Sequence, residues 1–577
     1  MSKFPSRLIP WGVTLLLGVA AFLFWWLGYP AGLAYQEQLQ LFLWTGDYLC
    51  SRLAEPGGVA RYVAELLIQF YNLIVVGALL LAVIFMAVQR LTWQLMKAPL
   101  CLLPLSLAPV LLFWYALGSE NVMLTYGVAL LMALVVTLVL NRLNGMNCYL
   151  WWAVVIVLMP FFYWITGPMA LLIPLCVTPP QSSGRWLNVT GRVVGVLTVV
   201  LCLLLAAHVL PFPVERLRMG ISYYRYVQPL PTVLLSIPLV VVLLRYLPRW
   251  LAPVLRTKGG RRVVLVVGCA ALAGLLVLLP TSYDERTYTL MEYDYLVRLG
   301  RWDAIIKKSE QKQPDLPMSV CATNLALGMT NQLGERAFQF YQRGSDGLLP
   351  PSERNFSTQQ LTGEAYFQLG LINTAQRFAF EAMEALPNYN KSGRAIKRLA
   401  ETNLINGQYE VARKYLHILE RTFFYRKWAQ RTEALLDQEE EINSHPLYGR
   451  LRRCLVSEEL LFSEGELDKI CGQLFIHNPQ NTMAMQYLLM FPLMNKDIKK
   501  FMNYMQVVQS RVLYNPRACQ EGVVFAMTMQ HQQLPKGVVS PMVERNYNEF
   551  GAIYNNEGKD SPRLEQFKHT LWYYYVK

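Results

Sequence analysis

The chain has 577 residues, of which 54% are apolar and 16% charged, and its formal net charge is +14. Residues 1–280 carry 18 Lys/Arg against 6 Asp/Glu, whereas residues 281–577 carry 35 against 33. The length exceeds one ordinary domain, and the composition favours a membrane protein. No Lys/Arg stripe or nucleic-acid-binding motif is present, so the positive charge indicates membrane topology and contact with anionic lipid headgroups rather than nucleic acid.

Residues 1–280 are predicted to form a polytopic transmembrane helical bundle. A crossing needs about 20 apolar residues, and residues 147–178 form an apolar block that is long for one crossing and short for two. Pro160, Gly167 and Pro168 interrupt this block, and we count it as two spans. About nine spans result, near residues 9–27, 64–88, 98–118, 121–140, 147–164, 166–178, 192–210, 229–248 and 263–280.

Lys and Arg in short loops favour the cytoplasmic side of a membrane. With nine spans, that side receives the N-terminus and nearly every basic loop, while Glu120 and everything after residue 280 lie on the other side. The first span also fits a cleaved signal, with Gly32-Leu33-Ala34 as the cleavage site. The cytoplasmic cations are then Lys3, Arg7, Arg90, Lys97, Arg142, Arg185, Arg192, Arg249, Arg256, Lys258, Arg261 and Arg262.

From residue 281 onward, apolar residues take helical spacing, which predicts a soluble all-helical region. Four short segments recur at intervals of 34 to 37 residues: Leu299-Gly300, Leu333-Gly334, Leu369-Gly370 and Asn406-Gly407. We expect each near the end of one helix and the start of the next. Residues 281–430 resemble the tetratricopeptide repeat, and residues 431–577 are interpreted as a further helical region with degenerate repeats. Pro314 and Pro387 fall where second helices should stop.

Stacked helix pairs of that kind leave a concave surface that usually binds a peptide or protein. The resemblance therefore implies a protein or peptide partner on the repeats. The alternative is that the repeats only brace the membrane part.

The sequence contains no P-loop, dinucleotide-binding fingerprint, G-x-S-x-G elbow, H-E-x-x-H motif or Cys/His ligand spacing. It therefore identifies no cofactor and no metal site. The candidates that remain are polar residues in or near the membrane, where they carry a cost unless they are used or paired.

The loop of residues 28–63 is predicted to lie outside the cytoplasm as an amphipathic helix on the membrane surface. Glu37 follows the first span by about ten residues, close enough to a lipid headgroup to act as a general base. An ordinary solvated carboxylate explains the same residue. In the second predicted span, Glu65, Gln69 and Asn72 are spaced i, i+4 and i+7 and should share one face, either for function or for interhelical hydrogen bonds.

The loop between the seventh and eighth predicted spans opposes the charge rule, because it is basic and yet should be translocated. Arginine binds phosphate bidentately, and interleaved tyrosines anchor at interfaces. We therefore interpret this loop as a site for a lipid phosphate, with simple binding of anionic headgroups, or pairing with the repeat region, as the alternatives. The residues are Arg216, Arg218 and Arg225, with Tyr223, Tyr224 and Tyr226, and with His208 near the same membrane face.

Together, a cytoplasmic N-terminus, an acidic residue in a long first external loop and a translocated repeat domain resemble the GT-C class of polyprenyl-linked glycosyltransferases. The resemblance implies that Glu37 is the catalytic acidic residue and that the basic loop is the lipid-phosphate site. The class usually has two acidic residues separated by one, whereas Gln38 and Leu39 follow Glu37 here. Asp47 is the candidate for the second carboxylate.

The chain is also similar to uncharacterised polytopic membrane proteins of Gram-negative anaerobes, which implies a bacterial inner membrane with the C-terminal domain in the periplasm. Three functions are then compatible with the sequence. The first is transfer of a sugar or glycan from a polyprenyl-phosphate carrier to a periplasmic acceptor. The second is a non-catalytic anchor whose repeats recruit envelope proteins. The third is a transporter or flippase, suggested by the interrupted helix and the intramembrane polar face.

Overall fold

The computed structural model describes residues 8–143, 146–180, 184–225, 231–350, 356–386, 390–456, 466–534 and 537–577. In these ranges every regular element is a helix, apart from two isolated β-bridges, which confirms the all-helical class. The chain divides into two compact units. Unit 1 comprises Met1–Tyr288, Pro387–Lys391 and Arg421–Phe424, and unit 2 comprises the remainder. Lys3, Arg7, Tyr226 and Pro387 lie outside the described residues.

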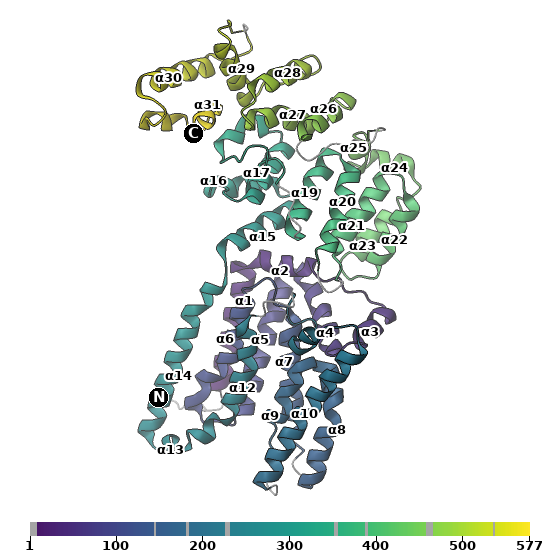
Figure 1. The fold of residues 1–577 in the computed structure, drawn as a ribbon, viewed down its shortest axis with the longest axis vertical. Coiled ribbons are helices and arrows are strands. Elements are labelled where there is room, and N and C mark those ends of the chain that lie inside the picture. The colour runs from purple at the N-terminus through teal and green to yellow at the C-terminus, as the bar shows by residue number, and fades with distance from the viewer. Residues whose placement is uncertain are drawn as a thin grey trace. The chain divides into compact units, whose positions relative to one another are not determined.

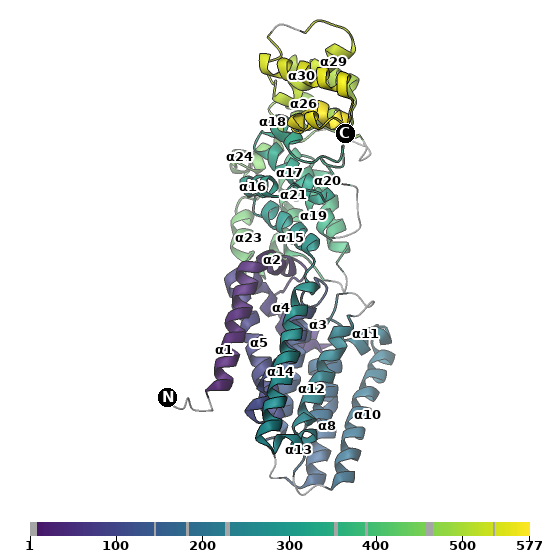
Figure 2. The same cartoon turned by 90° about the vertical axis from the view of Figure 1, so that its left-hand side faces the viewer.

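Unit 1 is a bundle of long apolar helices with several short helices at one end (Figure 1). Figure 2 shows α1, α10, α12 and α14 as long helices whose axes are roughly aligned. The elements are α1 (Ile9–Leu23), η1 (Phe24–Gly28), α2 (Pro30–Gln38), α3 (Gly46–Leu53), α4 (Gly58–Gln69), η2 (Phe70–Asn72), α5 (Ile74–Met96), η3 (Leu100–Leu107), α6 (Ala108–Ala116), α7 (Leu124–Leu140), α8 (Cys148–Thr166), η4 (Gly167–Leu171), α9 (Leu172–Cys176), α10 (Arg185–Val209), α11 (Val214–Met219), α12 (Thr232–Trp250), α13 (Ala252–Leu255), α14 (Lys258–Leu278) and η5 (Leu279–Ser282).

Six helical segments of unit 1 have the length and apolar composition needed to cross a membrane. Their apolar side chains mostly face outward: only 11% of the most apolar stretch of Lys258–Ser282 is buried within the protein. Such surfaces are suited to lipid rather than water. The segments are Ile9–Gly28, Ile74–Met96, Cys148–Cys176, Arg185–Val209, Thr232–Trp250 and Lys258–Ser282, with shorter apolar helices at Leu100–Ala116 and Leu124–Leu140. The count of nine crossings stays a prediction.

The predicted span over residues 64–88 is wrong in its bounds. Helix α4 ends at Gln69, a 3-10 turn follows, and Leu73 adopts an extended conformation before α5 begins at Ile74.

The prediction of a single surface helix over residues 28–63 is also wrong, because α2, α3 and the start of α4 occupy this loop. Seven of the nine α2 residues are buried, so α2 is a packed part of the unit.

Residues 147–178 do not form one straight helix. Helix α8 ends at Thr166, and Gly167 adopts φ +63°, a left-handed value that favours glycine. The Tyr223 hydroxyl donates to the Thr166 carbonyl, and the Tyr223 carbonyl accepts from the Met123 amide just before α7 begins, so Thr166 lies near the start of α7. The Thr178 amide donates to the side chain of Asn141, the residue after α7, so Thr178 lies near the end of α7. The chain therefore reverses at Gly167 and runs back alongside α7.

The core of unit 1 is aromatic and aliphatic, with Phe85, Phe113 and Trp151 fully buried. One polar chain crosses it. The Thr14 hydroxyl donates to the Gln89 carbonyl oxygen at 2.6 Å, and the Gln89 amide donates to the Ser106 hydroxyl at 2.8 Å. This chain joins α1, α5 and η3 by interhelical hydrogen bonds, as polar residues do within membranes.

Unit 2 consists of antiparallel helix pairs that follow one another along the chain (Figure 1). It includes most of α15 (Glu285–Arg298) and then α16 (Trp302–Gln311), α17 (Pro317–Met329), α18 (Leu333–Arg336), η6 (Ala337–Gln339), α19 (Phe356–Leu369), α20 (Ile372–Glu384), α21 (Gly393–Ile405), α22 (Tyr409–Glu420), α23 (Arg426–Glu433), α24 (Glu439–Ser444), α25 (Tyr448–Arg452), α26 (Leu467–His477), α27 (Thr482–Met494), α28 (Ile498–Gln509), α29 (Arg517–Met529), α30 (Pro541–Glu557), η8 (Pro562–Phe567) and α31 (Leu571–Val576).

Three of the four recurring glycines lie between paired helices, as the spacing predicts. Gly300, Gly370 and Gly407 have φ values of +62°, +98° and +73°, which allow the chain to turn directly from one helix into the next. Leu333-Gly334 also lie where the spacing predicts, because α17 ends at Met329 and these two residues open α18. There the left-handed residue is Asn331, at φ +59°, and asparagine tolerates this conformation better than most residues.

We expect Gly370→Ala to destabilise the protein more than Gly407→Ala. Both alanines incur left-handed strain of about 1–2 kcal/mol. A Cβ on residue 370 would in addition lie 2.5 Å from the Cβ of Cys454, whereas nothing lies within 4 Å at residue 407. Thermal unfolding of the full-length protein in detergent measures the difference, with Gly551→Ala, at an unobstructed helical position where alanine is unstrained and favoured, as the control. Equal melting temperatures for the two turn variants would show that Cys454 yields to the methyl group.

Candidate functional site

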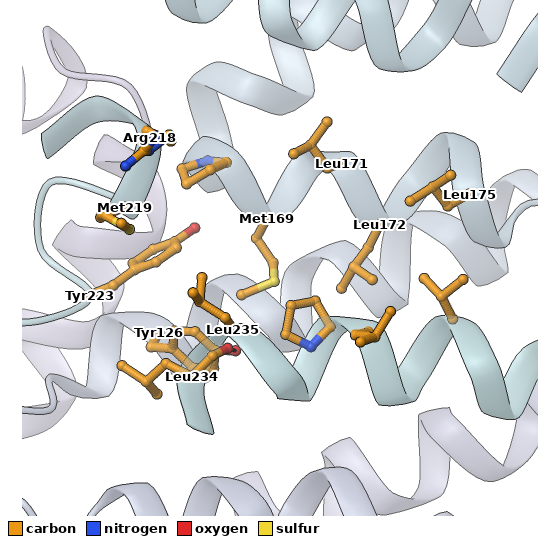
Figure 3. Close-up of a pocket in the computed structure, with 14 residues that line it drawn as sticks. Tyr126, Met169, Leu171, Leu172, Leu175, Arg218, Met219, Tyr223, Leu234 and Leu235 are labelled. Atoms are coloured by element: carbon orange, nitrogen blue, oxygen red, sulfur yellow. Dashed lines mark hydrogen bonds between the residues drawn. The ribbon is translucent and has the colours of Figure 1, made fainter. Parts of the chain in front are cut away.

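A mostly apolar pocket of about 330 Å³ lies in unit 1 between the η4–α9 segment, α12 and α11 (Figure 3). Figure 3 shows Arg218 and Tyr223 at one end and Leu175 at the other. The lining residues are Tyr126, Pro168, Met169, Leu171, Leu172, Leu175, Arg218, Met219, Tyr223, Leu234, Leu235, Pro238, Leu239 and Val242.

The two long walls of the pocket follow from local sequence. On α12, Leu234, Pro238 and Val242 are separated by four residues each, so they form one stripe along the helix. Opposite, the reversal at Gly167 brings Pro168 and the leucines that follow against this stripe. From Leu234 to Val242 the wall is about 12 Å long, at a rise of about 1.5 Å per residue.

Arg218 is the sole charged residue among the described residues that line the pocket. It belongs to α11, which is fixed by Leu217, a residue with 1% exposure. The Arg218 side chain is exposed, and so are Leu235 and Leu239, at 56% and 59%. The pocket is therefore an open apolar trough with a cation at one end, which fits an apolar chain attached to an anionic group.

The other residues predicted for a lipid phosphate divide into two places. Arg216 is half-buried on the same short helix as Arg218, and His208 is exposed in the last turn of α10, which packs against α11. Arg225 differs. It is 5% exposed, its guanidinium donates to the Glu120 backbone carbonyl at 2.9 Å, and it lies 5.8 Å from the centre of the Tyr35 ring.

Glu37 lies in α2 and is only 4% exposed. Its neighbour Gln36 donates to the same Glu120 carbonyl that accepts from Arg225, at 2.7 Å, so α2 is packed against this loop. Asp47, by contrast, is exposed in the first turn of α3, where a carboxylate favours the positive end of the helix dipole. The two carboxylates therefore do not face solvent together.

Glu65 is the centre of a buried ion-pair network. Its carboxylate accepts from Arg52 and Arg61, both at 2.8 Å, and from the Tyr48 hydroxyl. Arg61 also pairs with Glu55 at 2.6 Å. Two guanidinium groups and two carboxylates balance, so no charge is left over for a ligand, and the network holds α3 against α4.

The pKa of Glu65 shows which effect dominates in this network. Burial would raise the pKa of this carboxyl, but the neighbouring Arg61 and Arg52 outweigh burial and hold the pKa below its ordinary value. Gln69, also buried, donates to the Gln40 backbone carbonyl at 2.8 Å. Asn72 is on the 3-10 turn after α4. The single polar face predicted for Glu65, Gln69 and Asn72 is therefore broken at the end of α4.

Two polar features lie outside the sequence predictions. Arg245, buried within α12, donates to the Cys176 carbonyl at 3.2 Å and to the Thr178 hydroxyl at 2.6 Å. It therefore caps the end of α9. In the sequence, a lone arginine within an apolar run could have indicated this buried polar contact.

In unit 2, His417, Glu420 and Glu433 place possible metal-ligating atoms within 4.8 Å of one another. Arg413 lies 3.6 Å from Glu433 and offsets this charge.

The fold and the pocket define an all-helical protein whose first unit carries membrane-length apolar helices. The chain belongs to the family described as "Family of unknown function (DUF6057)", whose model matches residues 6–577. No curated protein and no solved structure matches it. The match runs through both units.

We expect Glu65→Gln to lower the free energy of unfolding by about 3–5 kcal/mol, because it leaves two buried guanidinium groups with one carboxylate. Glu55→Gln, at the network's more exposed edge, should cost less. Since the folded-state pKa of Glu65 is lowered, its stabilisation is complete above about pH 4.3, the ordinary value, and is lost as pH falls through the folded-state pKa. Melting temperatures in detergent measured from pH 7 to pH 3 should therefore converge for wild type and Glu65→Gln on acidification. A gap independent of pH would contradict the assignment.

Proposed function

We propose that unit 1 binds a lipid that combines a long apolar chain with a phosphate headgroup. The observation that carries this proposal is the apolar trough with Arg218 at one end. An arginine fork matches phosphate oxygens bidentately, and the exposed leucines along the trough would let the rest of the chain continue into the bilayer. His208 and Arg216, near the same end, would add positive potential around the headgroup.

We further propose that the protein is a GT-C-like glycosyltransferase of a bacterial inner membrane, which moves a sugar or glycan from a polyprenyl-phosphate carrier to a periplasmic acceptor. In this proposal Arg218 stabilises the charge that grows on the leaving phosphate. The helix pairs of unit 2 would form a tetratricopeptide-like solenoid that binds the acceptor or a partner. Glu37 as the general base requires α2 to open, since this carboxylate is buried.

The proposed orientation places the N-terminus in the cytoplasm and unit 2 in the periplasm. Its support is the distribution of charge in unit 1. The ends of α7, α9 and α12 meet through Asn141, Thr178 and Arg245, and the loops at this end are the basic ones. Clustering of Lys and Arg at one end of a bundle favours the cytoplasm for that end.

A non-catalytic membrane anchor that binds the same lipid is the second candidate. The observation that favours it is that no acidic residue is among the described residues that line the pocket. A transferase needs a group to orient or deprotonate the acceptor, whereas an anchor that captures a lipid needs only the cation and the trough.

Arg218→Ala is expected to weaken binding of a polyprenyl phosphate about tenfold or more, because a charge-assisted hydrogen bond contributes about 1.5–3 kcal/mol. Binding of a photoreactive polyprenyl phosphate to the protein in nanodiscs measures this, and Arg256→Ala is the matched control, because Arg256 is an exposed cation directly after α13 and does not line the pocket. The neutral polyprenol should label wild type and Arg218→Ala alike. Equal labelling of all variants by the phosphate would refute the lipid-phosphate site.

The transferase and the anchor predict different glycosylation of envelope proteins in a strain that lacks the protein. We expect a glycoprotein stain of its envelope proteins to show missing glycosylation, restored by wild type but not by Arg218→Ala or Glu37→Gln. Restoration by Glu37→Gln would remove Glu37 from the mechanism while keeping the transferase. Unchanged glycosylation in the deletion strain would exclude the transferase and leave the anchor.

A further inference from the structure

Three arginines gather around Tyr246 at the end of unit 1 where α9 ends, α10 begins and α12 ends. The guanidinium carbons of Arg192, on α10, and Arg245, on α12, lie 5.6 and 6.0 Å from the centre of the Tyr246 ring. Arg249 follows Arg245 by one helical turn, and both Arg249 and Arg192 are close enough to repel the charge of Arg245. We refer to the three arginines as the arginine cluster.

Arg245 and Tyr246 form a fixed frame for the arginine cluster. Arg245 is 5% exposed and donates to the Cys176 carbonyl and to the Thr178 hydroxyl. The Tyr246 hydroxyl donates to the Leu175 carbonyl at 2.6 Å. The backbone at the end of α9 therefore holds both side chains in place, and the Tyr246 ring lies beside two guanidinium groups.

Arg192 and Arg249 have donors that the described part of the chain does not use. The Nε atom of Arg192 is buried and donates to no described residue. Arg249 is exposed, and no hydrogen bond or ion pair joins it to the described residues. A guanidinium group has five N–H donors and keeps its charge throughout the physiological pH range. An anion that accepts from these donors would therefore be stabilised here.

The chain around the arginine cluster does not supply this anion. Residues 121–283 contain a single acidic residue, Glu215, which belongs to α11. Helix α11 follows the opposite end of α10, about 25 Å from Arg192 at a rise of about 1.5 Å per residue. Salt screens the attraction between exposed charges at such a distance. The counter-charge for the arginine cluster therefore comes from outside the chain.

Two exposed tryptophans indicate that the arginine cluster lies at the depth of lipid headgroups. Trp186, near the start of α10, is 84% exposed, and Trp250, the last residue of α12, is 61% exposed. The Tyr246 and Trp250 rings stack, with their centres 6.2 Å apart. Tryptophan and tyrosine concentrate at the membrane–water interface, which is also where the phosphates of lipids lie.

We propose that the arginine cluster binds one phosphate group, with Arg192 and Arg249 as the donors and with Arg245 and Tyr246 as the frame that positions them. Guanidinium groups bind phosphate oxygens through pairs of charge-assisted hydrogen bonds. The phosphate belongs either to an anionic phospholipid of the adjacent leaflet or to a soluble phosphate compound. The depth of the cluster favours the lipid, because basic pockets between membrane helices bind anionic headgroups.

This site is separate from the apolar pocket and does not rest on the function proposed for it. None of the three arginines lines the pocket, whose own cation, Arg218, is on α11. On α12 the last pocket residue is Val242, and Arg249 follows it by about 10 Å along the helix axis. A ligand bound at one site therefore contacts different segments from a ligand bound at the other.

The test uses the full-length protein in phosphatidylcholine nanodiscs that contain a phosphatidylglycerol analogue with a photoreactive group beside its headgroup. Digestion with chymotrypsin, whose cleavage does not depend on arginine, and mass spectrometry then locate the label and quantify it over a range of lipid fractions. The variant Arg192→Gln/Arg249→Gln removes the two proposed donors. The matched control, Arg256→Gln/Arg262→Gln, removes two exposed cations outside the cluster.

We expect label at the start of α10 and the end of α12. The lipid fraction that gives half-maximal labelling there should rise at least about tenfold in Arg192→Gln/Arg249→Gln but not in the matched control, because charge-assisted hydrogen bonds to the phosphate are lost. Unchanged labelling in the double variant, an equal loss in the matched control, or equal labelling by a diacylglycerol analogue without phosphate would each overturn the proposal. Label confined to α11 would also overturn it, while leaving the apolar pocket intact.

The single variant Arg249→Gln keeps the test decisive if the double variant does not fold, because Arg249 is exposed. It should raise the half-maximal lipid fraction at least about threefold, since it removes one of the two donors, and an unchanged value would overturn the proposal. Inorganic pyrophosphate distinguishes the two sources of the phosphate. Displacement of the label by millimolar pyrophosphate identifies a soluble phosphate compound, whereas label that persists identifies the lipid.

Discussion

The structure of unit 1 depends on the hydrogen bonds that side chains make to the backbone groups of residues 166–178. Within a bilayer, an unpaired carbonyl or amide costs several kcal/mol, so irregular backbone needs partners from the protein. Side chains from three other parts of the unit supply them: Tyr223 for Thr166, Tyr246 for Leu175 at 2.6 Å, Arg245 for Cys176 and Asn141 for Thr178. This segment is also one wall of the apolar pocket. The hydrogen bonds that make the reversal possible therefore also position the proposed site.

The cations of the protein fall into two groups according to their hydrogen-bond and ion-pair partners. Arg61 and Arg225 are buried, and their guanidinium groups donate to carboxylates and to a backbone carbonyl, respectively. These contacts fix loops to helices. A buried charge without such partners would be costly. Arg218 is exposed instead, at one end of the apolar pocket. This difference in environment is the physical reason why binding is assigned to Arg218.

Sequence reasoning succeeded where the determining interactions are local. The apolar runs predict helices, and Gly300, Gly370 and Gly407 predict turns, because both depend on residues close together in the chain. Sequence reasoning failed where the determining contact is with a residue far away in the sequence. Leu73 breaks the helix expected over residues 64–88 at a point that no Gly or Pro marks. Glu37 is buried in α2, which packs through Gln36 and Tyr35 against Glu120 and Arg225, residues that are distant in the sequence. The three arginines of one loop were equivalent in the sequence, and only burial separates Arg225 from Arg218.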